Sequence, residues 1–156
     1  MKIKSIWVHT SASRYGTASL IDAWHAHNGW NRKEEFVTAE YPLRHIGYNF
    51  VIPNGYARDS RNYLPSLDGT IQLGRQVGEQ LAHARGANNN AIAICVVGKD
   101  GQFSAKQIVA LYGLTLTLML QHELQVSDVF GHYESAYERS RDTSKTCPDI
   151  DMARFR

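Results

Sequence analysis

The sequence has few cysteines, few prolines and no long uninterrupted hydrophobic run. Two cysteines and four prolines occur among 156 residues, so the chain is neither a disulfide scaffold nor a fibrous protein. Its longest apolar-rich stretch, residues 108–120, is interrupted by Tyr112, Gly113, Thr115 and Thr117 and is too short to cross a bilayer. We therefore expect no stable membrane insertion.

Charge of either sign is also sparse and evenly spread. The formal net charge is +2, and the lysines and arginines form no cluster in the sequence, so nucleic acid is not an expected partner. Residues 1–5 include lysines but lead into no apolar run of signal-peptide length. We expect a protein that is made in the cytosol without an export signal.

The remaining composition is that of an ordinary globular domain. Apolar residues make up 43% of the chain and charged residues 21%, both close to globular averages. A chain of 156 residues can bury a core by itself and fits one domain. The sequence contains no internal repeat, and we expect residues 1–156 to form a single domain.

Hydrophobic periodicity predicts alternating strands and helices. Thr17 and Ser104 are suitable helix N-caps, and Gly29 follows the first predicted helix. The pattern indicates an α/β fold with helices flanking a central sheet. Strands are expected at residues 4–9, 47–52, 69–74, 91–97 and 126–131, helices at 18–27, 76–84 and 105–123, and long polar loops at 53–67 and 133–145.

The two cysteines stand in contrasting surroundings. Cys95 lies within the apolar run 91–97, where a thiol usually packs as a small hydrophobe. Cys147 lies in a polar loop two residues after Lys145, and a nearby lysine favours the thiolate form, which binds metals or acts as a nucleophile. The residues alone leave both roles of Cys147 open.

Two of the seven histidines, His9 and His132, stand at the ends of predicted strands. A catalytic zinc ion requires three side-chain ligands and one open position, and Cys147 would complete a His-His-Cys set. No short metal-binding motif links these three residues. From spacing alone, two ordinary strand-end histidines are the simpler interpretation.

A set of motifs in a definite order adds a more specific signal. Along the chain the motifs are IWVHTSA (6–12), WH (24–25), GYNFVI (47–52), DGTIQLGR (68–75), AHA (82–84), NAIAI (90–94), GH (131–132) and KTCPD (145–149). The ordered set resembles the zinc-dependent N-acetylmuramoyl-L-alanine amidases shared by phage endolysins and peptidoglycan recognition proteins. The likeness extends over residues 4–151 and implies the fold of that family, a central mixed sheet flanked by helices.

The resemblance implies a zinc enzyme that acts on peptidoglycan, and we expect it to be a monomer. His9, His132 and Cys147 would bind one Zn²⁺ ion, which leaves a fourth position for the attacking water. The bond cut would be the amide between N-acetylmuramic acid and the L-alanine of the stem peptide.

Three further residues match functional positions of the family. Tyr48 matches an active-site tyrosine, and Lys145 matches a lysine that stabilises the oxyanion. His83 matches a histidine of the substrate groove, so it is expected to contact substrate. Without the resemblance, core packing of Tyr48 and surface positions for Lys145 and His83 would be the ordinary interpretations.

A phage-type endolysin is the leading functional interpretation. Such an enzyme would be synthesised in the host cytoplasm and would reach the cell wall, in the periplasm, after another factor permeabilised the membrane. A second interpretation is a cytosolic amidase that recycles muropeptides, although those relatives commonly carry Asp at the position of Cys147. A third is a non-catalytic peptidoglycan-binding module, and a fourth is a metal-free hydrolase with Cys147 as nucleophile and His132 as base.

Overall fold

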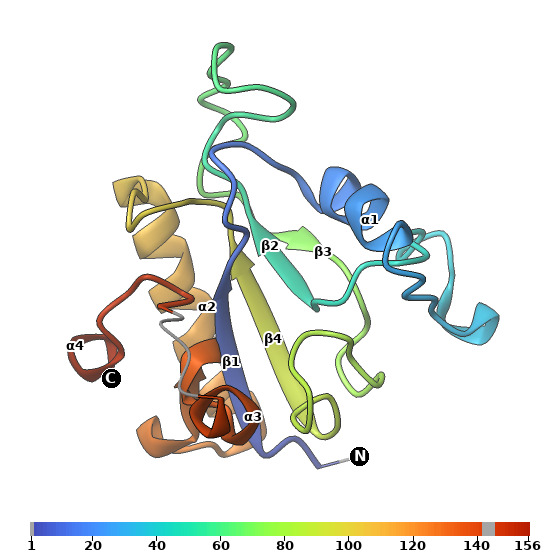
Figure 1. The fold of residues 1–156 in the computed structure, drawn as a ribbon, viewed down its shortest axis with the longest axis vertical. Helices are drawn as coiled ribbons and strands as arrows, with labels where there is room; N and C mark the ends of the chain where they lie inside the picture. The colour runs from blue at the N-terminus through green and yellow to red at the C-terminus, as the bar shows by residue number, and fades with distance from the viewer. Residues whose placement is uncertain (1, 142–145) are drawn as a thin grey trace.

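Strand β1 (Ser5–Thr10) lies between two parallel neighbours, β4 (Ala91–Val96) and β5 (Val129–Gly131). The computed structural model describes residues 2–141 and 146–156. Strand β2 (Phe50–Ile52) pairs with β4 in parallel, and β3 (Gln72–Leu73) pairs with β2 in antiparallel, which gives the order β3-β2-β4-β1-β5. The sheet is therefore mixed, as expected, and its parallel strands end at one common edge (Figure 1).

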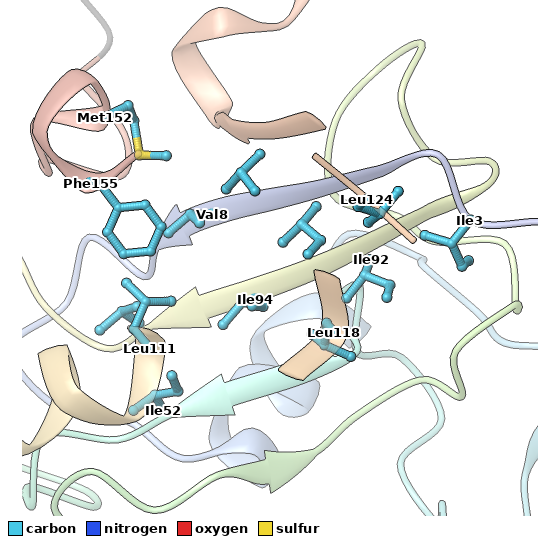
Figure 2. Close-up of a cluster of buried hydrophobic side chains, with 13 residues drawn as sticks. Ile3, Val8, Ile52, Ile92, Ile94, Leu111, Leu118, Leu124, Met152 and Phe155 are labelled. Carbon is cyan, nitrogen blue, oxygen red and sulfur yellow. The ribbon is translucent and has the colours of Figure 1, made fainter. Parts of the chain in front are cut away.

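One face of the sheet packs against helix α2 (Ala105–His122) and the C-terminal helix α4 (Met152–Phe155). Every second residue of the central strands points to this side, so Val8, Ile92 and Ile94 share a core with Leu111 and Leu118 (Figure 2). Burying one such side chain contributes about 1.5–3 kcal/mol. The two central strands are thus firmly held, which fixes the positions of the residues at their ends.

The other face packs against helix α1 (Ala18–Ala26), which lies on the opposite side of the sheet from α2 in Figure 1. Ala18 and Ile21 of this helix belong to a second buried cluster that also contains Cys95 of β4. Thr17 caps the helix as predicted, because its side chain accepts a hydrogen bond from the N–H of Leu20. The expected packing of the Cys95 thiol is confirmed, since Cys95 is fully buried.

Several predicted boundaries were wrong for identifiable reasons. The strand expected at 47–52 is shortened to β2 because the Asn49 side chain accepts the hydrogen bond from the Ala93 N–H. The strand expected at 69–74 is only β3, which follows a turn at Gly69 with φ of 76°. Residues 126–128 form the 3-10 helix η2 (Val126–Asp128) rather than strand, because the Asp128 side chain accepts from the Gln125 N–H.

Two segments differ in kind from their prediction. Residues 76–84 form turns rather than a helix, and Gly78 adopts a φ of 96° that a right-handed helix does not allow. The polar loop expected after His132 instead contains the 3-10 helix η3 (His132–Glu134) and helix α3 (Ala136–Ser140). Another 3-10 turn, η1 (Glu34–Phe36), lies in the irregular connection after α1.

No helix within residues 2–141 and 146–156 is both long enough and apolar enough to cross a membrane.

Candidate metal centre

Parallel pairing of β1 with β5 brings the first two candidate ligands together. Val8 lies opposite Gly131 in the register, so the residues that follow, His9 and His132, emerge side by side at the carboxyl edge of the sheet. Their ring centroids are 4.5 Å apart. His9 is almost completely buried, at 1% exposure, on the face opposite the α2 core. Residues distant in sequence thus meet because parallel strands end at the same edge.

The residue before His132 is a glycine for a steric reason. A Cβ atom at Gly131 would lie 2.9 Å from side-chain atoms of Met152, Pro148 and Tyr133, a distance at which neighbours must shift. This close approach lets the loop that carries Cys147 pack against the end of β5. The Tyr133 N–H donates a hydrogen bond to the Cys147 carbonyl at 3.0 Å.

The third candidate ligand is held by the end of β1. The Thr10 N–H donates to the Cys147 sulfur at 3.3 Å, and the Thr10 hydroxyl donates to the Gly98 carbonyl at 2.6 Å. A backbone N–H that points at sulfur stabilises the thiolate, the form that binds metals. Cys147 is half-buried, beside a hollow of about 500 Å³ lined in part by Tyr133, Thr146 and Asp149.

One ligand atom from each of His9, His132 and Cys147 lies within 4.8 Å of the other two. In a tetrahedral zinc site, neighbouring nitrogen and sulfur ligands are separated by about 3.3–3.6 Å, given the usual Zn–N and Zn–S bond lengths. Small side-chain movements would therefore close the set around one ion. Two imidazoles and a thiolate form a donor set that zinc accepts readily.

Each histidine of the set has a buried polar neighbour. His9 Nε2 lies 2.8 Å from His83 Nδ1, and His83 Nε2 lies 2.9 Å from the Ala87 carbonyl oxygen. His132 Nε2 lies 3.8 Å from a carboxylate oxygen of Glu138, which is 5% exposed. The sequence prediction missed Glu138, although the spacing of Ser135 and Glu138 is that of a capping box and could have indicated the start of α3.

Tyr48 lies next to this cluster. Its ring centroid is 5.1 Å from that of His9. Burial is the main cause that raises the pKa of Tyr48 well above its ordinary value, and the electrostatic effect of the two cysteines and a side-chain hydrogen bond with Cys95 raise it further. The hydroxyl therefore stays protonated at neutral pH and can donate a hydrogen bond.

Two further residues, His83 and Lys145, were also predicted for the site. His83 is 8% exposed, and burial lowers the pKa of its ring to about 4. Lys145 lies outside the described residues. His25, which was given no role from sequence, is buried beside Tyr48 and accepts a hydrogen bond on Nδ1 from the Gly47 N–H at 2.9 Å.

A comparison with known protein families identifies the family to which this chain belongs. The family model described as N-acetylmuramoyl-L-alanine amidase matches residues 1–150. The chain belongs to the N-acetylmuramoyl-L-alanine amidase family. It is thus an amidase of peptidoglycan, and the three candidate ligands all lie within the matched part of the chain.

Relatives of this amidase are found among phage proteins. It is 28% identical to the endolysin of Escherichia phage T7 over 161 residues, which span 97% of the chain and 83% of that protein. It is 27% identical to the endolysin of Enterobacteria phage T3 over 162 residues, spanning 97% of the chain and 84% of the relative.

Solved structures share the fold of the amidase. The N-acetylmuramoyl-L-alanine amidase LysC from Clostridium intestinale superposes with a TM-score of 0.68 at 21% identity, over 99% of this chain and 83% of LysC. The bumblebee protein PGRP-SA superposes with a TM-score of 0.61 at 20% identity, over 95% of this chain and 76% of PGRP-SA. The predicted fold class is confirmed by these superpositions.

Proposed function

We propose that the amidase is a phage-type endolysin that uses one Zn²⁺ ion, held by His9, His132 and Cys147, to cut the amide between N-acetylmuramic acid and L-alanine. The observation that carries the proposal is the convergence of the three ligand atoms within 4.8 Å at the carboxyl edge of the sheet. The donor set and the family membership both support zinc.

Each residue around the site has a proposed chemical task. A zinc ion in this site supplies Lewis acidity, which polarises the scissile carbonyl and brings the pKa of the attacking water towards about 7. The Thr10 N–H, which donates to the Cys147 sulfur, favours the thiolate that a zinc ion would bind. The protonated Tyr48 hydroxyl donates a hydrogen bond to the carbonyl oxygen as negative charge develops there, and Lys145 is the second proposed donor.

The biological setting is proposed from the relatives. Proteins named endolysin in phages T7 and T3 match nearly the whole chain, so peptidoglycan of a bacterial host is the proposed substrate. We propose that the enzyme acts as a monomer with one catalytic domain at residues 1–156. Synthesis in the host cytoplasm and action in the periplasm after membrane permeabilisation complete the proposal.

The decisive experiment measures release of L-alanine N-termini from purified peptidoglycan. Four samples are compared: wild type, chelator-treated protein, chelated protein with zinc restored, and Cys147→Ser. We expect activity to disappear with the chelator, to return with zinc and to fall by at least about 100-fold in the variant, because an oxygen ligand replaces the thiolate. Circular dichroism of each sample checks that the fold is retained.

Three contrary outcomes would each replace the proposal with a different function. Activity that is indifferent to chelation and lost in Cys147→Ser would indicate a cysteine nucleophile with His132 as its base. Binding of peptidoglycan without release of N-termini in any sample would indicate a recognition module. Activity on soluble muropeptides with none on intact wall would favour a recycling amidase over an endolysin.

A further inference from the structure

His83 has both ring nitrogens engaged inside the protein. Nε2 faces the Ala87 carbonyl oxygen at 2.9 Å, and Nδ1 faces His9 Nε2 at 2.8 Å. The side chain comes from the loop between β3 and β4 and is 8% exposed. The His83 side chain thus reaches the candidate metal centre by its contact with His9.

The positions of the hydrogen atoms on His83 and His9 follow from the Ala87 carbonyl oxygen, at which this chain of contacts ends. A carbonyl oxygen only accepts, so the proton of the neutral His83 imidazole lies on Nε2 and its Nδ1 is an acceptor. His9 must then carry its own proton on Nε2, which donates to His83. The lone pair of the neutral His9 ring then lies on Nδ1, so Nδ1 is the nitrogen that can coordinate a metal ion in this tautomer.

We propose that His83 is a positioning residue for the metal: it fixes the tautomer and ring orientation of His9 so that Nδ1 of His9 is the ligand atom. The inference rests on the proposed zinc site. Histidine ligands in metalloproteins commonly donate their second N–H to a carboxylate, carbonyl or water, and such partners raise metal affinity. Here a second histidine takes that place and passes the interaction to a backbone carbonyl.

The loop that carries His83 is built to hold the ring still. Asn88 Oδ1 accepts hydrogen bonds from the backbone N–H groups of His83 at 2.9 Å and Ala84 at 3.1 Å. The Leu81 N–H donates to the Asn88 carbonyl at 2.9 Å, which closes the loop on itself. The ring of His83 also packs against Trp7 at a centroid distance of 6.1 Å. The acceptor that His9 meets is thus fixed before any metal binds.

Two substitutions separate the two ends of the interaction. In His83→Asn, the amide oxygen can take the place of Nδ1 and still accept from His9, while the bond to Ala87 is lost. In His83→Gln, the amide nitrogen can take the place of Nε2 and still donate to Ala87, while the acceptor for His9 is lost. The two variants are similar in size and polarity, so each serves as the control for the other.

The readout is the zinc dissociation constant of the full chain, measured by competition with a chromophoric chelator. We expect His83→Gln to weaken zinc binding by about 10- to 100-fold and His83→Asn to stay within about threefold of wild type. Unfolding temperatures of the metal-free proteins show whether either variant is misfolded. The cobalt-substituted proteins provide a second readout, since a disturbed His9 ligand changes the visible absorption of the cobalt ion.

Contrary results would distinguish this inference from the proposed function. Equal zinc affinity in wild type and His83→Gln would overturn the positioning role, and so would equal weakening in both variants, which would reflect packing alone. A raised KM for peptidoglycan fragments with unchanged zinc affinity would assign His83 to substrate contact instead. Failure of the wild type itself to bind zinc would overturn the proposed function and, with it, this inference.

Discussion

Replacement of Glu79 by glutamine tests how the irregular connection after α1 is held next to the site. The Arg32 and Glu79 side chains are 0% and 3% exposed, and Arg32 Nε and Nη2 donate to the carboxylate at 2.8–3.2 Å. Arg75 Nη1 lies 3.6 Å from the same carboxylate. One buried carboxylate is therefore shared by two buried guanidinium groups. The remaining donors of Arg32 bind the carbonyl oxygens of Phe36, Tyr41 and Leu43.

The size of the effect follows from this burial. Removing one partner of a buried ion pair costs about 3–5 kcal/mol, because the other charge is left uncompensated in a medium of low polarity. Glu79→Gln keeps the shape and one acceptor, yet it leaves Arg32 without the carboxylate that it binds and removes the larger of the two favourable charge interactions of Arg75. Domains of this kind are stable by only about 5–15 kcal/mol. With a urea m-value of about 2 kcal/mol/M, the unfolding midpoint should fall by about 1.5–2.5 M.

The assay is urea unfolding followed by circular dichroism. The matched control is Glu34→Gln, which removes a carboxylate from an exposed pair with Arg44 whose side chains are 78% and 56% exposed. That change should cost less than about 1 kcal/mol. Because the Arg75 N–H donates to the carbonyl of Tyr48, Glu79→Gln should also lower amidase activity. Equal midpoints for the two variants would refute the reasoning.

Three further predictions concern the site and its supports. Tyr48→Phe should lower kcat by about 100- to 1000-fold with zinc content unchanged, and a normal rate would exclude the hydroxyl from catalysis. Burial lowers the pKa of His25 from 6.5 to about 4, so the folded state should lose on the order of 2 kcal/mol between pH 6.5 and 4, after allowance for screening. His25→Asn, which keeps an acceptor for the Gly47 N–H, should flatten this acid limb in pH-dependent unfolding; an unchanged slope would contradict the assignment. Gly47→Ala should destabilise by about 1–3 kcal/mol, because its Cβ would lie 2.1 Å from the Ala82 oxygen, whereas Gly113→Ala, with no atom within 4 Å, should not destabilise in thermal unfolding.

The parts of the fold that sequence predicted well are those with strong local patterns. Strand β4 is a continuous apolar run, and α2 begins at Ser104, whose capping box with Gln107 is visible in the sequence. Segments whose structure depends on contacts between residues distant in sequence were harder to predict. Residues 76–84 have the local pattern of a helix, but Arg75 and Glu79 are drawn into the buried ion cluster instead, and local propensity does not contain that information.

The candidate site likewise has a part that the sequence could predict and a part that it could not. His9 and His132 could be placed at strand ends from hydrophobic pattern, but their adjacency depends on the register of β1 with β5, which required the family resemblance. The neighbours of the two histidines were beyond sequence reasoning. The contact between His9 and His83 joins a strand to a loop that is distant in sequence. Glu138 is a candidate site residue only because the fold buries it next to His132.

The central claim is that His9, His132 and Cys147 bind one zinc ion, and zinc-edge X-ray absorption of the zinc-loaded protein tests it most directly. The account predicts four-coordinate zinc with two nitrogen ligands at about 2.0–2.1 Å, one sulfur at about 2.3 Å and one further light atom. The sulfur contribution should vanish in Cys147→Ser. A zinc shell without sulfur in the wild type, or a sulfur signal that persists in the variant, would contradict the account.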